Sequence, residues 1–416
     1  MRRERLYLLP VYIGSFKYYE KIVPALNEKY DVRFLIIRPD DDRRRGMIGY
    51  AQERGLSFDI LDVGLTDAGR RLPFWSPLSK HFQHMQACRR FLRRTQAKKL
   101  ISVKAISTFS TIFREANALG VETIVLQSAL VPPQGFYSDY QKSKKYSPVA
   151  QRIYFFLIEF LRSALAILFR GPQYYFVSSR PQKVGVIGEE GRNIFHNRFG
   201  FDISTIEVVG SAEFQQVSEL CDEIKNKPEK REQLLRKYSL DERKKKILIL
   251  SSWYENYAQV KSAHTVEEDR EQVSYFQKIV ETIRSVCEED VEILFKLHPA
   301  ERNIYESYRA FGVKLYADEA SSEELVVLSD LYIADPCTSA NYMVIASKVP
   351  AIFFNATPLK ALNKCTLFFP INRVEDSFEG LFSRLVQFKE GTLPLGYTSE
   401  DLDLKSIDRI VRFIDK

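Results

Sequence analysis

The sequence of 416 residues lacks the short motifs that mark the common phosphate and protease sites. It contains no Walker loop, no HExxH or GxSxG motif, no protein-kinase signature and no GxGxxG. The turn after the first predicted strand holds only Gly14-Ser15, which is too little glycine for a dinucleotide fingerprint. These absences argue against ATP hydrolysis by a P-loop and against hydride transfer by a Rossmann-type dehydrogenase.

Cysteine is scarce, odd in number and widely spread, without a CxxC pair. The five residues are Cys88, Cys221, Cys287, Cys337 and Cys365. This usage indicates a reducing compartment and excludes a zinc ribbon. The first apolar run is short and contains Pro10, so it reads as a buried strand rather than a secretory signal. We therefore expect a cytoplasmic protein.

The composition excludes a disordered or fibrous chain, because 45% of the residues are hydrophobic and 28% are charged. The length fits two domains of about 200 residues each. Residues 1–231 hold 37 Lys and Arg against 24 Asp and Glu, a net charge of +13, whereas residues 232–416 hold 24 against 30, a net charge of −6. The basic half predicts an anionic partner, either a phospholipid surface or a phosphorylated acceptor. No nucleic-acid-binding module is present, so we predict no nucleic-acid partner.

Short apolar runs alternate with helical patterns along both halves of the chain. Such alternation, with nearly continuous apolar strands, predicts parallel sheets covered on both faces. The strands expected in the first half are Leu6–Ile13, Val32–Ile37, Phe58–Val63, Leu100–Ser107, Glu122–Leu126, Tyr174–Ser178 and Ile206–Gly210. Those expected in the second half are Ile247–Ser251, Val291–Leu297, Val313–Tyr316, Leu331–Ala334 and Ala351–Phe354.

The predicted fold class is α/β, with two doubly wound Rossmann-like domains that face a cleft. A polar, charged stretch at 218–246 is the best place for a domain boundary. We predict an N-terminal acceptor-side domain of residues 1–230 and a C-terminal nucleotide-donor-binding domain of residues 231–400. Residues 401–416 form a C-terminal helix that returns to the N-terminal domain.

One segment departs from the alternating pattern. Residues 153–169 are almost wholly apolar, and residues 137–146, just upstream, are rich in lysine and tyrosine. Cations beside an amphipathic helix are suited to anionic headgroups, which allows a peripheral contact with the inner face of the cell membrane. A buried helix, or an interface in an oligomer, is the alternative.

A histidine at a predicted strand end is the most informative chemical feature. Lys296-Leu297-His298-Pro299 closes a strand of the second domain, and ligands of open parallel sheets bind at the carboxyl ends of the strands. An imidazole there can donate to a phosphate oxygen and stabilise a leaving phosphate, and Lys296 can add positive charge. The alternative is a structural histidine.

Hydroxyl residues follow two other strands of the second domain. Thr338 and Ser339 precede a predicted helix, where free backbone N–H groups favour an anion, although either residue can simply cap the helix. Ser251 and Ser252 follow the first strand of this domain and can contact a phosphate in the same way.

The order of these motifs resembles the donor domain of GT-B glycosyltransferases. The stretch KLHP, then GVKLY, then SSEELVVLSDLYIADPCTSANYMVIASKVPAIFF is similar to that of bacterial surface-polysaccharide enzymes. Their types are the CDP-glycerol glycerophosphotransferases, the capsular Kdo transferases and the polysialyltransferases. The resemblance covers about residues 170–360 and adds GT-B to the predicted fold class.

The resemblance implies roles for individual residues. His298 and Pro299 match the motif whose histidine contacts the donor phosphate, and Thr338 and Ser339 match the paired serines that hold it. Two positions depart from the pattern. Met343 stands near the place of a ribose-binding glutamate, for which Asn341 or Glu323 would substitute, and Lys348 stands where glycine is common.

The general base of a transfer reaction has to come from the first domain, and several residues qualify. The candidates are Glu20, Asp67, His81, His84 and Gln127. His81, His84 and Cys88 share one helix face, which allows a soft metal site, but a helix face of mixed burial is the simpler account, so we predict no metal. A basic stripe follows, Arg89-Arg90, Arg93-Arg94 and Lys98-Lys99, which is either a solvated face or a contact for anionic lipid or acceptor.

The sequence therefore predicts a metal-independent glycosyltransferase without a cofactor. It would move a sugar or polyol phosphate from a nucleotide-activated donor of CMP, CDP or UDP type to a glycan or lipid-linked acceptor. By resemblance, the product belongs to surface polysaccharide, such as capsule or lipopolysaccharide. The alternatives are an enzyme like UDP-N-acetylglucosamine 2-epimerase and a non-catalytic GT-B scaffold.

Overall fold

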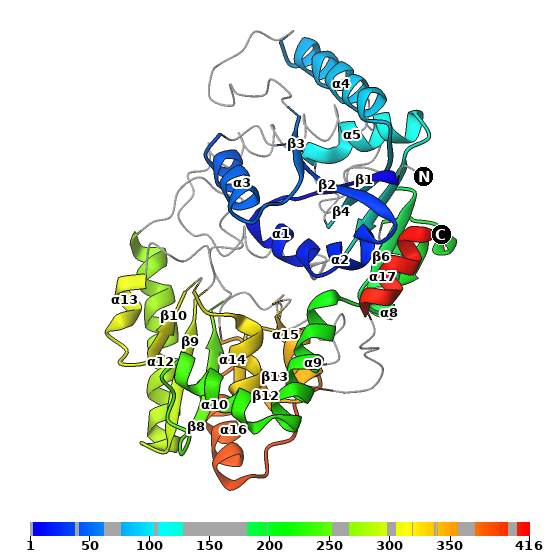
Figure 1. Cartoon of the computed structure of the whole chain (residues 1–416). Coiled ribbons are helices and arrows are strands. Elements are labelled where there is room, and N and C mark those ends of the chain that lie inside the picture. Colours follow the sequence, from blue (N-terminus) through cyan, green and yellow to red (C-terminus); the bar gives the residue numbers. More distant parts are fainter. Residues whose placement is uncertain are drawn as a thin grey trace. The chain divides into compact units, whose positions relative to one another are not determined.

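The structure is a computed structural model of the chain, and it separates into two compact units (Figure 1). Unit 1 contains the described residues up to Ala212 together with the C-terminal ones, and unit 2 contains those from Glu213 to Tyr397. The structure describes residues 3–37, 41–61, 76–103, 107–127, 181–197, 199–251, 266–297, 305–317, 319–336, 338, 340–356, 371–397 and 406–416.

Unit 1 is built on a parallel sheet of seven strands in the order β3-β2-β1-β4-β5-β6-β7. The strand order reverses between β1 and β4, as in a doubly wound fold, which confirms the predicted class. The strands are β1 (Glu4–Leu9), β2 (Tyr30–Ile36), β3 (Phe58–Ile60), β4 (Ala97–Ser102), β5 (Glu122–Leu126), β6 (Lys183–Val186) and β7 (Ile206–Val208).

Helices cover both faces of this sheet. Tyr7 and Phe34 point to opposite faces, because Tyr7 pairs with Arg33 and the next residue along each strand reverses direction. Phe16 of α1 stacks on Phe34 at 4.8 Å, and Phe91 of α4 packs on Tyr7 at 5.2 Å. The helices on the α1 side are α1 (Ile13–Glu20), α2 (Val23–Asn27) and α3 (Asp41–Glu53), and those on the other side are α4 (Ser76–Thr95) and α5 (Ser107–Ala118).

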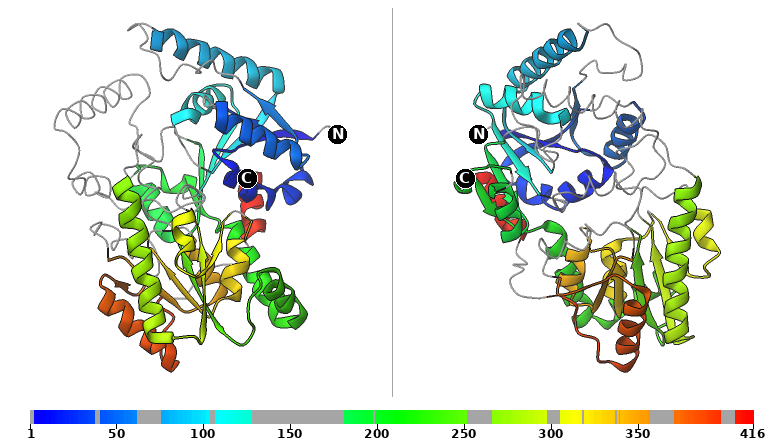
Figure 2. Two further views of the ribbon diagram at one scale, coloured as in Figure 1. Left: turned by 90° about the vertical axis from the view of Figure 1, so that its left-hand side faces the viewer. Right: turned by 180° about the vertical axis from the view of Figure 1, so that it is seen from behind.

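The last helix, α17 (Ser406–Asp415), belongs to unit 1 and lies beside its N-terminal helices (Figure 2). Asp415 forms an ion pair with Lys29 and accepts a hydrogen bond of 2.9 Å from the Tyr30 hydroxyl. Phe413 packs over Gly185, where a side chain would find no room. The end of the chain is thus part of the first folding unit.

Unit 2 is built on a parallel sheet of six strands in the order β10-β9-β8-β11-β12-β13. The strands are β8 (Lys245–Leu250), β9 (Val291–Lys296), β10 (Lys314–Tyr316), β11 (Leu331–Ala334), β12 (Ala351–Phe354) and β13 (Val374–Glu375). The long helix α12 (Val266–Cys287) and α16 (Phe378–Glu390) pack side by side on one face, with α13 (Tyr305–Arg309) next to α12 (Figure 2).

An aromatic core joins these helices to the sheet. Phe295 of β9 lies 5.2 Å from Phe276 of α12 and 4.9 Å from Tyr308 of α13, measured between ring centroids. The buried hydroxyl of Tyr308 accepts a hydrogen bond of 3.1 Å from Gln272. Three further helices of unit 2 are α10 (Pro228–Lys237), α14 (Ser322–Leu328) and α15 (Asn341–Ser347).

The structure differs from the predicted elements in several places. The first strand ends at Leu9, because Pro10 cannot donate to the ladder and α1 starts three residues later. Strands β6 and β13 were not predicted, since one contains Gly185 and the other has only two residues. The predicted strand 174–178 and the segments 137–146 and 153–169 lie outside the described residues.

The division between the units falls earlier than residue 230. Helix α9 (Ala212–Asn226) precedes that residue and α10 spans it, yet all but the first residue of α9 belongs to unit 2. Phe214 of α9 packs on Tyr342 of α15 at 4.6 Å, and the Tyr316 hydroxyl donates to the Tyr238 carbonyl just after α10. Within the part of the chain that the structure describes, no helix is both long and apolar enough to cross a membrane.

Candidate functional site

The carboxyl ends of β8 and β9 are tied together in unit 2. The Ser251 amide donates a hydrogen bond of 3.0 Å to the Lys296 carbonyl, and the Ser251 hydroxyl donates to the same oxygen at 3.3 Å. Ser251 is buried, so in this structure its hydroxyl fixes the strand end. The phosphate contact predicted for Ser251 remains a prediction.

Lys296 places a buried cation at the same edge. Its side chain is 6% exposed, and its ammonium donates to the Ala317 carbonyl at 2.6 Å and to the Leu297 carbonyl at 3.3 Å. These bonds join the ends of β9 and β10. A cation at the carboxyl edge raises the local positive potential, which favours an anionic ligand there.

A tight turn connects β11 to α15. The Thr338 carbonyl accepts a hydrogen bond of 3.2 Å from the backbone amide of Asn341, and the Thr338 hydroxyl accepts one of 3.4 Å from the backbone amide of Ala340. The Thr338 side chain remains partly exposed. The sequence predicted phosphate contacts for four hydroxyl residues. Of the two that the structure describes, Ser251 is buried and Thr338 is partly exposed.

Asn341 holds this turn from inside. It is fully buried, and its amide donates to the carbonyls of Asp335 at 3.0 Å and Pro336 at 3.2 Å. Its side-chain oxygen accepts from the Tyr332 hydroxyl at 3.0 Å. The sequence offered Asn341 as a substitute for a ribose-binding glutamate; in this structure its side-chain amide is bonded to the turn and to Tyr332 of β11, and the ribose contact remains a prediction.

Glu323 is the other proposed substitute, and it remains partly exposed. It lies in the first turn of α14, where it accepts a hydrogen bond of 2.7 Å from the Ser321 hydroxyl. Ser321 caps the helix by accepting from the Glu324 amide at 3.2 Å. Because α14 follows β10, the partly exposed Glu323 carboxylate lies at the carboxyl edge.

The two residues that depart from the GT-B pattern are Met343, which lies in α15, and Lys348, which ends it. Met343 is buried in the helix, so it packs rather than faces a ligand. Lys348 ends the helix in the left-handed conformation, with φ of 60°, which is the position where glycine is favoured. His298, Pro299, Ser252 and Ser339 lie outside the described residues, so their predicted roles remain predictions.

Gln127 marks the carboxyl edge of unit 1. It is 7% exposed, and its side-chain oxygen accepts a hydrogen bond of 3.1 Å from the Ile187 amide after β6. A Cβ at Gly191 would lie 2.5 Å from this oxygen, so the first turns of α8 (Glu189–Asn197) close tightly over it. Gln127 therefore holds two strand ends together, and the predicted catalytic role is not supported.

Glu20 is the last residue of α1, about two helical turns from the carboxyl edge of the sheet in unit 1. Its carboxylate accepts a hydrogen bond of 3.2 Å from the Tyr50 hydroxyl of α3. Burial and the carboxylate together raise the pKa of Tyr50, burial having the larger effect. At about 1.5 Å per residue, Glu20 is about 10 Å along the helix axis from Ile13, which places it away from the edge.

Of the other candidate bases, the structure describes the side chain of His84 alone. Asp67 lies outside the described residues, and of His81 only the position in α4 is described. His84 and Cys88 are buried on the inner face of α4, and burial raises the pKa of the Cys88 thiol to about 12. Within the described ranges, no group of three or more metal-ligating side chains lies together.

An exposed apolar pair at the carboxyl edge of unit 1 was not predicted from the sequence. Tyr12 and Ile13, where β1 turns into α1, are 45% and 40% exposed. The ring of Tyr12 lies over Gly14, where a Cβ would come within 2.6 Å of it. The signal was an aromatic residue two positions before Gly14, the only glycine of the turn. This pair offers a surface for a sugar ring or another apolar group.

Solved structures with the same architecture are known, whereas no family model and no curated protein matches the sequence. The UDP-GlcNAc 2-epimerase from Neisseria meningitidis, solved with UDP-GlcNAc, aligns over 99% of both chains with a TM-score of 0.57 and 12% identity. MurG from Acinetobacter baumannii aligns over 99% of both chains, with a TM-score of 0.54 and 10% identity. A glycosyltransferase from Rickettsia africae aligns over 100% of this chain and 99% of its own, with a TM-score of 0.53 and 10% identity. This chain accordingly has the GT-B fold.

Proposed function

We propose that the chain is a glycosyltransferase whose nucleotide-activated donor binds at the carboxyl edge of unit 2. The observation that carries the proposal is the presence of three features at one edge: the Lys296 cation, the partly exposed Thr338 and the Glu323 carboxylate. They lie at the ends of, or after, β9, β11 and β10 in a fold shared with a UDP-GlcNAc 2-epimerase and a glycosyltransferase.

Each feature has a task in binding the donor. Thr338 and Ser339 would donate to the phosphate, and His298 would contact the leaving phosphate as the glycosidic bond breaks. Negative charge develops on that leaving group, and the fixed positive charge of Lys296 stabilises it without reorganisation. Glu323 would accept hydrogen bonds from the ribose hydroxyls. We infer that the acceptor, a glycan or a lipid-linked sugar, lies against Tyr12 and Ile13 of unit 1.

A second candidate is epimerisation of a nucleotide sugar. Several solved structures that align with this chain are UDP-GlcNAc 2-epimerases, and three of them cover 99–100% of it with TM-scores of 0.55–0.57. An epimerase converts the donor without an acceptor, whereas a transferase releases the nucleotide only when an acceptor receives the sugar. This difference separates the two candidates.

The test begins with the nucleotide. A panel of CMP, CDP, UDP, GDP and ADP is added to the purified protein, and thermal unfolding is followed. A ligand at 100 times its dissociation constant stabilises the folded state by about 2.7 kcal/mol, so one member should raise the unfolding temperature. The sugar nucleotide of that class is then incubated alone and with glycan acceptors, and the products are identified by NMR.

The outcomes assign the function. Nucleotide release that requires an acceptor supports the transferase, and a change of sugar configuration without acceptor supports the epimerase. A nucleotide shift without turnover of any donor would indicate the non-catalytic scaffold. If no nucleotide raised the unfolding temperature, the donor site itself would be refuted. The His298→Ala variant should lose turnover while its unfolding temperature stays the same.

A further inference from the structure

Each unit has an open cavity at the amino edge of its sheet, where the parallel strands begin. The proposed donor site lies at the opposite, carboxyl edge of unit 2. The cavity of unit 1, about 520 Å³, lies between the first residues of β1 and β4 and the last turn of α4. The cavity of unit 2, about 540 Å³, lies beside the first residues of β8 and β9. The two are alike in place and size, so a difference in their charges is informative.

The charges of the two cavities differ sharply. In unit 2 four cations line the cavity, together with three acidic residues, Asp241, Glu289 and Asp290. In unit 1 the lining contains four cations and one acidic residue, Glu4. The four cations are Arg3, Arg5, Arg93 and Lys98. The cavity of unit 1 therefore has an excess of positive charge that its counterpart lacks.

Most of this excess is not neutralised within the described residues. Arg5 pairs with Asp31 at 2.9 Å, and Arg3 donates to the Asn27 carbonyl, which carries no net charge. Arg93 and Lys98 are exposed, and among the described residues no carboxylate lies within ion-pair distance of either. Three cations thus remain available to an external anion.

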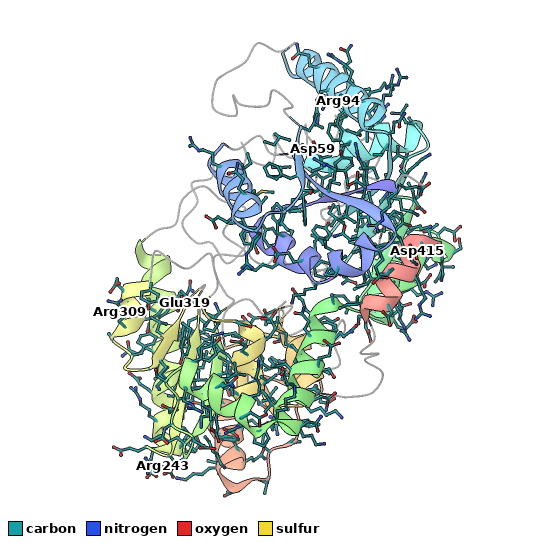
Figure 3. The ribbon with its side chains drawn as sticks, in the orientation of Figure 1. Asp59, Arg94, Arg243, Arg309, Glu319 and Asp415 are labelled. Atoms are coloured by element: carbon teal, nitrogen blue, oxygen red, sulfur yellow. The ribbon has the colours of Figure 1, made fainter. Side chains whose placement is uncertain are left out.

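The same charge continues along the outer face of α4. Arg90, Arg93 and Arg94 are exposed and lie at spacings of three and four residues, so they share one face of the helix. Arg94 stacks on Phe91 at 5.9 Å, and Arg90 is hydrogen-bonded to Gln86, a neutral partner. Figure 3 shows Arg94 on this helix. We call Arg3, Arg90, Arg93, Arg94 and Lys98 the basic face.

Stabilisation of the helix alone does not account for the basic face. Cations in the last turn interact favourably with the helix dipole, which explains Arg93 and Arg94. Lys98 lies beyond the helix, Arg3 precedes β1, and Arg90 is more than a turn from the end. One further arginine, Arg89, is held at 2.7 Å by the buried Glu115 and does the structural work of joining α4 to α5.

We propose that the basic face binds the surface of a membrane rich in anionic phospholipid. The cations extend over a helix face and an adjoining cavity, which suits an array of phosphates better than one compact anion. None of the large apolar side chains that are exposed in the described residues lies on α4. The contact is therefore electrostatic and peripheral, and salt weakens it. The inference does not depend on the proposed function.

Sedimentation of the full chain with lipid vesicles tests this proposal. Vesicles of phosphatidylcholine are compared with vesicles that also contain phosphatidylglycerol, at low and at high salt. We expect binding to the anionic vesicles alone, and release at high salt. Each cation close to such a surface contributes a factor of about five to the affinity. The double variant Arg93→Glu/Lys98→Glu, and separately Arg90→Glu/Arg94→Glu, should weaken binding by about tenfold or more.

A matched control comes from unit 2. Arg243 and Arg309 are 89% and 62% exposed, but each is paired with a carboxylate, Asp241 and Glu306 respectively. They are labelled with Arg94 in Figure 3. The double variant Arg243→Glu/Arg309→Glu makes the same change in net charge and should bind anionic vesicles within about twofold of the unmodified chain. Circular dichroism checks that each variant is folded.

Several results would overturn the proposal. Equal weakening in the control variant would show that net charge, and not the basic face, attracts the vesicles. Equal binding to uncharged vesicles would show an apolar contact elsewhere. If the chain bound no vesicles but bound pyrophosphate or duplex DNA through Arg93 and Lys98, the face would serve a soluble phosphate or a nucleic acid instead.

Discussion

Gln127 in unit 1 and Asn341 in unit 2 are buried amides at the carboxyl edges of their sheets. Gln127 reaches from β5 to the end of the neighbouring strand, where it accepts from the Ile187 amide. Asn341 forms its bonds within a single turn, to Asp335 and Pro336, and to Tyr332 just before it. Both residues were expected to contact ligands, and both instead hold the backbone that ligands would meet.

The comparison distinguishes residues that support the backbone at a carboxyl edge from residues that can contact a ligand there. A buried polar side chain must satisfy its hydrogen bonds inside the protein, because an unsatisfied group costs about 1–3 kcal/mol. The groups left for a ligand are the exposed ones. In unit 2 the groups that are at least partly exposed are polar, Thr338 and Glu323, and in unit 1 the exposed groups are Tyr12 and Ile13. The two edges are therefore suited to different parts of a reaction.

The largest effect is expected from Asn341→Leu. The change removes three hydrogen bonds and leaves the buried Tyr332 hydroxyl and two turn carbonyls without their partner. We expect the free energy of unfolding of unit 2 to fall by about 4 kcal/mol, measured by urea denaturation. Asn341→Asp is the control that keeps an acceptor for Tyr332. A loss below about 1 kcal/mol would show that water replaces the amide.

Gly191→Ala tests the corresponding turn in unit 1. The new Cβ would lie 2.5 Å from the Gln127 oxygen and 3.1 Å from the Val186 Cβ, so the turn must shift. Overpacking of this kind costs about 1–3 kcal/mol, and we expect a value near the upper end by thermal unfolding. Gly188→Ala is the matched control, since its Cβ would meet only the end of the Glu190 side chain. Equal stability of the two variants would contradict the close packing.

Gln127→Leu should have a smaller effect than Asn341→Leu. It removes the partner of one amide, that of Ile187, and we expect a loss of about 1–2 kcal/mol in the free energy of unfolding of unit 1. Hydrogen exchange at Ile187 provides a local measurement, because the amide should exchange faster. If Gln127→Leu reduced turnover without changing stability or exchange, Gln127 would have a catalytic role after all.

Thr338→Ala should change stability least and binding most. The hydroxyl accepts one long hydrogen bond of 3.4 Å, so we expect a loss below about 0.5 kcal/mol in the free energy of unfolding. The rise in unfolding temperature with nucleotide should nevertheless shrink. Thr392→Ala, at the far end of α16, is the control and should leave the nucleotide effect intact. An unchanged nucleotide effect in Thr338→Ala would remove Thr338 from the donor site.

Several elements follow directly from local sequence. Glu122–Leu126, Leu331–Ala334 and Ala351–Phe354 were predicted with the bounds that the structure gives β5, β11 and β12. Each is a short apolar run between polar or helical segments, which is typical of a strand buried on both faces. The resemblance to the GT-B pattern, and not local sequence, placed Lys348 where glycine is common, and in the structure Lys348 has the left-handed conformation that glycine favours.

Side-chain roles at the sheet edges did not follow from sequence. Ser251, Gln127 and Asn341 have the chemistry of ligand-binding residues, and their spacing after strands is right. In this structure all three side chains are buried and bonded within the protein, and burial depends on contacts with residues distant in the chain, such as Ile187 for Gln127. The same holds for the basic face, where residues from three segments meet at one amino edge.

The sequence by itself determined the alternation of strands and helices, the number of folding units and the excess of positive charge in the first half. These are local or additive properties, which periodicity and counting capture. Only the tertiary structure decided where the units divide, which polar groups are buried and which cations are left unpaired. Those properties depend on which distant segments the fold brings into contact, as Phe214 meets Tyr342 and Asp415 meets Lys29.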